Sequence, residues 1–368
     1  MILIAGATGL VGRAVAEVVS QGRRPWTELS RRAREDAVGE ESRTLVACDV
    51  TDPSALARAL RDVRSIVHVA GVAPGQRPAR ADHEIAAMRS LVALARERKV
   101  DRFVFLSAIG AAPDASHAWL RAKSEAEQLL RESGVAFVVL RAGLVTAPEA
   151  PVMHAIAQVV RGGVRTRRPL LRAGRVLPIA SGDVAIALAS ALDHHRMAGQ
   201  TIDIGTPPAL TLDELLSLVA QRLRRTLQFR RLPWAGPSLA SALACVEETP
   251  LTDAESLLRL FALLEAPDVA AYDRLLPMRR TSLSEELRTY PWGAAAPRVG
   301  EPLPTLRESA PSGMPLFIPG NKLRETGEGA MPPASWFGRV DPYGRPLGTD
   351  ESRERTAHER DDAAGEER

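Results

Sequence analysis

An apolar run at the start of the chain, Ile2–Ala5, leads directly into three evenly spaced glycines and then into a helical pattern over Leu10–Ser20. In a strand–loop–helix unit of this kind, the first glycine permits a tight turn, the second lets the backbone approach a pyrophosphate, and the third lets helix and strand pack closely. The amide groups of the first helical turn then face the anion. A strand–turn–helix without a ligand is the alternative. The pattern predicts a dinucleotide loop made of Gly6, Thr8, Gly9, Leu10, Val11 and Gly12.

The rest of the first half of the chain alternates short apolar runs with helical patterns. This alternation is typical of βαβ units and a parallel sheet, and the nearly continuous apolar runs indicate strands covered on both faces. The sequence therefore predicts an α/β fold, a doubly wound parallel Rossmann sheet with a smaller, mostly helical C-terminal region and an extended tail. The predicted strands are Ile2–Ala5, Trp26–Ser30, Thr44–Cys48, Ile66–Ala70, Phe103–Ser107 and Phe137–Leu140, and the further helices are Ser54–Asp62, Glu84–Arg98 and Leu120–Glu132.

The pattern changes twice along the chain. Residues 1–144 are predicted to form the dinucleotide-binding Rossmann domain. Residues 145–290 hold more helix and less strand, and are expected to form a smaller substrate or lid region. One short strand is predicted there at Thr201–Ile204, and capping-box sequences begin at Thr211, Thr252 and Ser282.

Residues 291–368 are rich in Pro and Gly and then in charged residues, which predicts a tail largely without a core of its own. Two segments of this tail are apolar, Pro315–Pro319 and Ala334–Gly338. Apolar segments in such a tail dock on a surface. That surface belongs either to a protein partner or to the chain's own folded part.

Charge and cysteine content exclude several classes of function. The formal net charge of +3 over 368 residues is small, and no basic block alternates with aromatic residues, so no nucleic-acid partner is expected. Cys48 and Cys245 give neither a disulfide framework nor a metal-binding spacing, so no metal site is predicted. Met1 runs straight into an apolar strand without a signal peptide, which favours a cytoplasmic location. The uncharged stretch Leu232–Val246 is too short to span a bilayer, and a buried helix is favoured over contact with a membrane surface.

Three further segments carry a family resemblance: Ala47-Cys-Asp-Val50, His68-Val-Ala-Gly71 and Phe103-Val-Phe-Leu-Ser107. Together with the Gly-x-x-Gly-x-x-Gly spacing, they resemble the atypical and extended short-chain dehydrogenase/reductase superfamily over residues 1–290. The resemblance implies an NAD(P)-binding Rossmann fold. It also implies that Asp49 and Val50 contact the adenine, that Ala70 and Gly71 lie along the cofactor, and that Ser107 is the active-site serine.

The end of the second predicted strand bears on cofactor choice. An NAD-preferring site usually has an acidic residue there, which bonds the ribose 2′-hydroxyl. This chain has Arg31 and Arg32 instead. A guanidinium group can bind a 2′-phosphate with two hydrogen bonds and stack on the adenine. NADP(H) is therefore favoured over NAD(H); the alternative is that these arginines form a solvated surface.

The superfamily's catalytic pattern is incomplete in this chain. Its members typically use Tyr-x-x-x-Lys plus Ser, with the Tyr phenol as general acid or base. Lys123 stands at the Lys position, where the resemblance implies contact with the nicotinamide ribose, but Trp119 occupies the Tyr position and cannot exchange a proton at neutral pH. His117 is the nearest titratable alternative. After the sixth strand, Arg141-Ala142-Gly143 stands where the family usually has Arg-Pro. Lys123 and Ser107 are the remaining catalytic candidates.

Among atypical members, the chain looks most like the NmrA-like and complex I accessory-subunit group, with a likeness to NAD-dependent epimerases. This resemblance implies a protein that retains its cofactor with little or no standard catalysis and acts as an accessory, sensor or assembly subunit of a larger complex, including one beside a membrane. The alternative is an NADPH-dependent oxidoreductase or epimerase with a non-standard acid or base, such as water, His117 or the substrate itself. A third hypothesis is a role at a membrane surface through Leu232–Val246.

Overall fold

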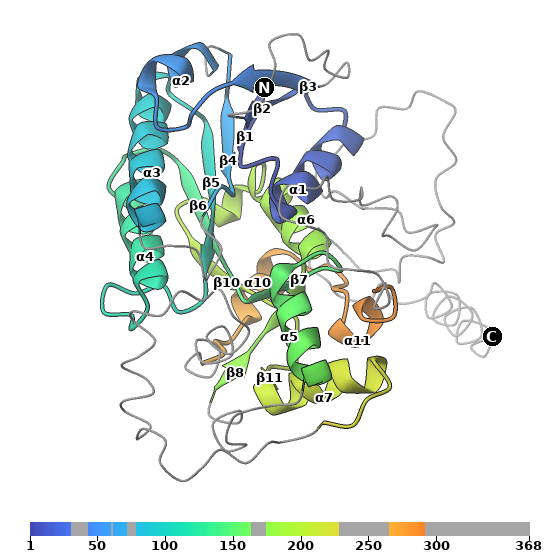
Figure 1. Ribbon diagram of the computed structural model, residues 1–368. Coiled ribbons are helices and arrows are strands. Elements are labelled where there is room, and N and C mark those ends of the chain that lie inside the picture. Colours follow the sequence, from blue (N-terminus) through green and yellow to red (C-terminus); the bar gives the residue numbers. More distant parts are fainter. Residues whose placement is uncertain (31–42, 60–61, 72–78, 163–173, 228–264, 291–368) are drawn as a thin grey trace, which may run out of the picture.

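Seven strands of the chain form one parallel sheet in the order β10-β6-β5-β4-β1-β2-β3 (Figure 1). The computed structural model describes residues 1–30, 43–59, 62–71, 79–162, 174–227 and 265–290. Every neighbouring pair of strands in this sheet runs parallel. The strands are β1 (Ile2–Ala5), β2 (Trp26–Ser30), β3 (Arg43–Ala47), β4 (Ser65–His68), β5 (Arg102–Ala108), β6 (Phe137–Ala142) and β10 (Thr201–Ile204).

The strand order reverses between β1 and β4. From β1 the chain moves outward through β2 to β3, then crosses back to β4 on the other side of β1 and continues outward again. In an open parallel sheet, the loops on either side of such a reversal leave in opposite directions and open a crevice at the carboxyl ends of the strands. The doubly wound sheet predicted from the sequence is confirmed, and the glycine loop that follows β1 lies at this reversal.

Helices cover both faces of the sheet (Figure 1). On one face lie α1 (Leu10–Gln21) and α6 (Ser181–Ala191), and on the other lie α2 (Pro53–Ala59), α3 (Ala79–Glu97) and α4 (Ala118–Arg131). β1 needs an uninterrupted apolar run because helices cover both of its faces. Ile2 and Ile4 pack on the α1 and α6 side, whereas Leu3 and Ala5 pack on the α3 and α4 side.

A second apolar core lies beyond the carboxyl edge of the sheet. It joins α5 (Pro151–Gly162), α7 (Leu212–Arg222) and α11 (Leu283–Glu286) to side chains from the ends of the main sheet. The remaining elements are β7 (Leu144–Thr146), parallel to β9 (Pro178–Ala180), β8 (Arg175–Val176), antiparallel to β11 (Leu210–Thr211), α10 (Ala270–Leu275) and the 3-10 helix His195–Met197.

Two of the three predicted capping boxes are confirmed. At the start of α7, Thr211 and Glu214 exchange side-chain to backbone hydrogen bonds, and Ser282 and Glu285 do the same at the start of α11. The third predicted box, at Thr252, lies outside the described residues, as do Leu232–Val246 and the tail 291–368. Within the ranges that the structure covers, no helix is both long and apolar enough to cross a membrane.

Candidate functional site

The glycine loop after β1 is fixed by close backbone contacts. Gly6 has a φ of +98°, and a Cβ there would lie 2.4 Å from the Ala70 nitrogen. A Cβ on Gly12 would lie 1.9 Å from the Gly6 carbonyl oxygen. Side chains at these two positions would push the loop away from β4 or from the start of α1. The loop therefore keeps the backbone geometry that the glycine spacing predicts.

The N-terminus of α1 is open to an anion. Gly9 is the N-cap of α1 and supplies no side-chain hydrogen bond, and the first turn of the helix contains no acidic residue. The free amide groups and the positive end of the helix dipole therefore favour a negative group at this point. This arrangement fits a dinucleotide pyrophosphate, with Thr8, Leu10 and Val11 completing the loop.

Other residues predicted to contact the cofactor follow strands at the same edge of the sheet. Ala70 and Gly71 follow β4, and the Val69 and Ala70 amides both donate to the Ala5 carbonyl, at 2.9 and 2.8 Å. Asp49 follows β3, and its Oδ1 accepts hydrogen bonds from the Thr51 amide at 2.9 Å and the Thr51 hydroxyl at 2.8 Å. The structure thus brings these predicted cofactor positions to one edge.

Three further positions were predicted to contact the cofactor: Val50, Arg31 and Arg32. Val50 is half-buried against the core under α2 and α3. Arg31 and Arg32, on which the NADP(H) preference rests, lie outside the described residues. Within the described ranges, no group of three or more His, Cys, Asp or Glu side chains is arranged to hold a metal ion.

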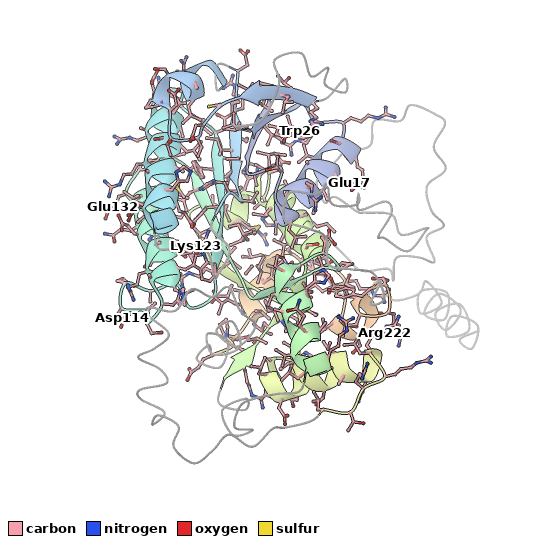
Figure 2. The ribbon with its side chains drawn as sticks, in the orientation of Figure 1. Glu17, Trp26, Asp114, Lys123, Glu132 and Arg222 are labelled. Atoms are coloured by element: carbon pink, nitrogen blue, oxygen red, sulfur yellow. The ribbon has the colours of Figure 1, made fainter. Side chains whose placement is uncertain are left out.

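The buried side chain of Lys123, labelled in Figure 2, carries its ammonium group to the same edge. Nζ lies 2.5 Å from Glu84 Oε1 on α3 and donates to the Leu106 carbonyl at 3.3 Å. It also lies 4.9 Å from the centre of the Phe105 ring. Gly71 is a further neighbour, since a Cβ there would come within 3.0 Å of Nζ. Because Gly71 is exposed, the ammonium group lies close to the protein surface at this residue.

His68, at the end of β4, lies beside this ion pair. Its ring is fully buried and stacks on Phe105 with 5.4 Å between the ring centroids. Neither ring nitrogen has a hydrogen-bond partner among the residues that the structure describes. Burial first, and the Lys123 charge second, lower the pKa of His68 to about 3. The imidazole is therefore neutral at physiological pH and carries no charge next to Lys123.

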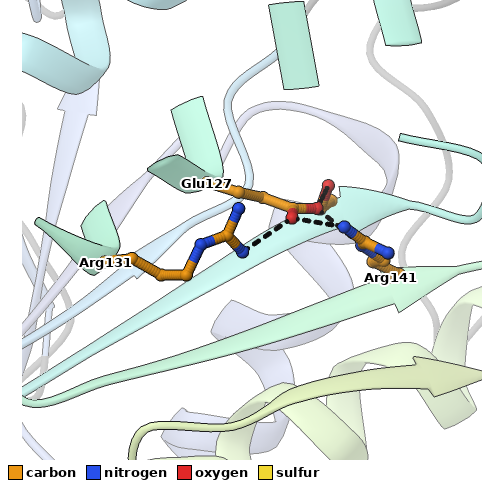
Figure 3. Close-up of polar contacts among 4 residues, drawn as sticks. Glu127, Arg131 and Arg141 are labelled. Atoms are coloured by element: carbon orange, nitrogen blue, oxygen red, sulfur yellow. Dashed lines mark hydrogen bonds and ion pairs between the residues drawn. The ribbon is translucent and has the colours of Figure 1, made fainter. Parts of the chain in front are cut away.

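Ser107, the active-site serine that the family resemblance implies, is hydrogen-bonded to a buried carboxylate. Its hydroxyl donates to Glu127 Oε1 on α4 at 2.5 Å. Glu127 is fully buried and also accepts hydrogen bonds from Arg141 Nε at 2.8 Å, Arg141 Nη2 at 2.7 Å and Arg131 Nη1 at 3.1 Å (Figure 3). The structure therefore places Ser107 in an ion-pair cluster beneath α4.

A pocket opens at the ends of β5 and β6, and Ser107 does not line it. Its cavity volume is about 30 Å³, and it is partly open to solvent. β5 runs one residue beyond Ser107, and successive strand residues point to opposite faces, so Ala108 lines the pocket in its place. Trp119, Ala142 and Gly143 also line it, and Arg175 supplies its charged group. The positions that depart from the family pattern therefore meet at one pocket.

His117, the alternative acid considered from the sequence, has a local structural role. It is the N-cap residue of α4, and its Nδ1 accepts a hydrogen bond from the Trp119 amide at 3.1 Å. Burial, and then the nearby Arg121 charge, lower the pKa of His117. Both effects favour the neutral imidazole that caps the helix. His117 is not among the residues that line the pocket.

Sequence reasoning missed two buried carboxylates, Glu84 and Glu127. Each lies on the apolar stripe of its helix, a signal that the sequence does contain. Glu84 precedes Ala87, Met88 and Leu91 by three, four and seven residues, which places all four on one helix face. An acid on such a stripe needs a buried partner, and the structure supplies Lys123 for one and Arg141 for the other.

Comparison with known proteins identifies relatives of two kinds. The chain is 28% identical over 233 residues to an NAD(P)H azoreductase from Xenophilus azovorans, covering 62% of this chain and 76% of that protein. It is 26% identical over 141 residues to the photosystem II assembly factor Ycf39 from Cyanophora paradoxa, covering 38% and 44%. It is 27% identical over 169 residues to subunit 9 of the NADH dehydrogenase [ubiquinone] 1 alpha subcomplex from Arabidopsis thaliana, covering 45% and 40%.

The fold also resembles a solved structure. The Bordetella bronchiseptica enzyme WbmG, crystallised with NAD and UDP, superposes with a TM-score of 0.58 at 15% identity, covering 78% of this chain and 91% of that one. A model of the NAD(P)H-binding family matches residues 6–195, more than half of the 368 residues. The resemblance to atypical short-chain dehydrogenases is thereby confirmed, and the chain belongs to the NAD(P)H-binding family.

Proposed function

We propose that this protein binds NADP(H) and retains it with little or no standard dehydrogenase chemistry, acting as an accessory, sensor or assembly subunit of a larger complex. The site has two parts, one that holds the dinucleotide and one where a substrate would react. The glycine loop, the N-terminus of α1 and Lys123 supply contacts for a dinucleotide, whereas the pocket beside them lacks the groups that carry out proton transfer in the superfamily.

The observation that carries the proposal is the chemistry of the pocket lining. Apart from Arg175, the lining side chains are apolar, and a guanidinium group does not exchange protons near neutral pH. A general acid or base must come within hydrogen-bond reach of the reacting atom, directly or through one water. Trp119 and Ala108 offer no such group in the part of the pocket that the structure describes.

The preference for NADP(H) is part of the proposal and rests on the sequence. Arg31 and Arg32 follow β2, where an acidic residue would favour NAD(H). Replacing both with serine should weaken NADPH binding and leave NADH binding nearly unchanged, because only NADPH carries the 2′-phosphate. Equal losses for both nucleotides would contradict the assigned preference.

The subunit role is suggested by two of the relatives and by the tail. One relative is named an assembly factor and another a respiratory-complex subunit, and each shares less than half of its length with this chain. The tail 291–368 contains the apolar segments Pro315–Pro319 and Ala334–Gly338. We propose that these segments dock on a protein partner, in the cytoplasm or beside a membrane complex. Removing the tail should release the partner without changing nucleotide affinity.

Titration with NADPH and NADH, read by tryptophan fluorescence, tests the proposal. The chain contains five tryptophans, so Trp119→Phe identifies the share of the signal that arises at the pocket. We expect tight NADPH binding, quenching that Trp119→Phe reduces, and no NADPH consumption with carbonyl or quinone acceptors. Turnover at an enzyme-like rate, above about 1 s⁻¹, would contradict the non-catalytic role.

A second candidate function is an NADPH-dependent reductase whose acceptor takes its proton from water. The length of the match to the azoreductase favours it, as does the place of Lys123 at the crevice. If this function holds, the acceptor screen detects turnover and Lys123→Met removes most of it. Turnover that persists in Lys123→Met at saturating NADPH would exclude a catalytic role for the ammonium group.

A further inference from the structure

The ion pair between Lys123 and Glu84 is almost completely removed from water. Its two side chains are 7% and 1% exposed, and the charged atoms lie 2.5 Å apart. Burying two charges costs several kcal/mol per ion, and the attraction between them seldom does more than offset that cost. Such a pair therefore adds little to stability. The hydrogen bonds that its charged groups can still donate then indicate what else it does.

The ammonium group of Lys123 has one N–H bond left over. A protonated lysine has three donors and no acceptor. Within the described residues, one donor is used by Glu84 and one by the Leu106 carbonyl at 3.3 Å. The Phe105 ring, 4.9 Å away, covers the group with an aromatic face. The backbone of Gly71 is the neighbour without a side chain, and a Cβ there would reach within 3.0 Å of Nζ.

Gly71 links the ammonium group to the predicted path of the cofactor. It directly follows Ala70, whose backbone touches the glycine loop at Gly6. The residue is exposed, so a ligand lying across the ends of β1 and β4 can approach Nζ over it. The N-terminus of α1, which favours the pyrophosphate, lies at the same edge of the sheet. A ribose of that dinucleotide is then the nearest source of hydroxyl groups for Lys123.

The surroundings of Lys123 offer no substitute for the Glu84 charge. The titratable group that faces it from β4 is His68, which is neutral at physiological pH because its pKa is about 3. β5 contributes the Phe105 ring and the Leu106 carbonyl, which carry no net charge. Among the described side chains, Glu84 is the one anion that forms an ion pair with Lys123.

We propose that Glu84 is a positioning residue for cofactor binding: it holds the Lys123 ammonium group against Gly71, so that the remaining N–H bond reaches a ribose hydroxyl of the bound dinucleotide. The inference rests on the cofactor binding in the proposed function and adds a residue to it.

Equilibrium binding of NADH and NADPH tests this role, with the dissociation constant of each variant divided by that of the wild type. In Glu84→Gln we expect this ratio to reach at least about tenfold for both nucleotides, because the ammonium group loses the partner that holds it against Gly71. Glu84→Asp keeps the carboxylate and should bring the ratio back close to one.

Two controls separate positioning from folding. The double variant Glu84→Gln/Lys123→Met removes both charges of the ion pair, so it should unfold close to the wild-type temperature and still bind weakly. Circular dichroism of each variant confirms the folded state. A Glu84→Gln ratio that stays near one, or a raised ratio that Glu84→Asp does not lower, would overturn the positioning role.

The failure of the inference can be told apart from that of the proposed function. If the wild type binds neither nucleotide, the proposed function is wrong and this inference falls with it. If the wild type binds and Glu84→Gln binds equally well, this inference alone is wrong.

Discussion

Replacing Gly12 with alanine tests whether contact between two backbone segments sets the cofactor loop. A Cβ at Gly12 would lie 1.9 Å from the Gly6 carbonyl oxygen and 2.7 Å from Ala7 Cα, whereas an ordinary contact begins at 3.4 Å. Both obstacles belong to the backbone, so no side-chain rotation relieves them. The start of α1 must therefore move away from the end of β1, and the amide groups that face the pyrophosphate move with it.

Two opposing effects set the magnitude of this change. Overpacking of a close contact costs about 1–3 kcal/mol. Alanine in place of glycine returns about 0.5–1 kcal/mol in a helix, because glycine loses more backbone freedom on folding. We expect a net loss of about 1–2 kcal/mol in the free energy of unfolding. NADPH affinity should fall by at least about tenfold, since the displaced amides no longer converge on the phosphates.

Urea unfolding and NADPH titration measure the two effects separately. Gly182→Ala, at the start of α6, is the matched control, because a Cβ there meets nothing within 4 Å. It should leave binding unchanged and stability unchanged or up to about 1 kcal/mol higher. If Gly12→Ala shows the same urea midpoint and the same NADPH affinity as Gly182→Ala, the close-contact explanation is wrong.

Three further predictions concern the buried polar groups. Ser107→Ala should lower stability by about 1–2 kcal/mol, through the hydrogen bond lost to Glu127, without changing NADPH affinity; weaker NADPH binding would show that the hydroxyl contacts the cofactor. Glu127→Gln should cost about 3 kcal/mol in urea unfolding, the low end of the range for buried pairs because the Arg141 side chain is 26% exposed, and a loss below about 1 kcal/mol would contradict the assigned role. Burial raises the pKa of Glu286 from 4.5 to about 7, so the folded state binds the extra proton and stability falls as pH rises between these values. Glu286→Gln should flatten the melting temperature across that window, and an unchanged slope would assign the pH dependence to another group.

The arrangement of the sheet could be predicted from the sequence because each strand is a buried apolar run with few competing interpretations. Several predicted strand ends differ from the observed ends by one or two residues, and at β5 this difference matters. The apolar pattern predicts a strand that ends at Ser107, whereas the observed strand continues to Ala108. Because side chains alternate between the two faces, that single residue decides which of the two lines the pocket. Local pattern alone does not fix such a boundary.

The partners of the buried charges could not be predicted because they come from distant parts of the sequence. Glu84 and Lys123 are 39 positions apart and on different helices, and Arg24 pairs with Asp193 across 169 positions. An acid on an apolar helix stripe indicates that a partner exists, but the identity of the partner depends on how α3, α4 and β6 pack. Sequence periodicity carries information about one helix face and none about its neighbour.

The contrast between the cofactor loop and the pocket follows from what each is made of. In the proposed function, the loop binds through backbone amides, whose placement depends on the close contacts at Gly6 and Gly12. The pocket's chemistry depends on individual side chains, so Ala108 and Trp119 are enough to remove both a hydroxyl and a phenol from it. Lys123 does not line the pocket, and its pairing with Glu84 fixes the ammonium group beside Gly71. In the proposed function, such a site holds a dinucleotide without the side chains that protonate a substrate.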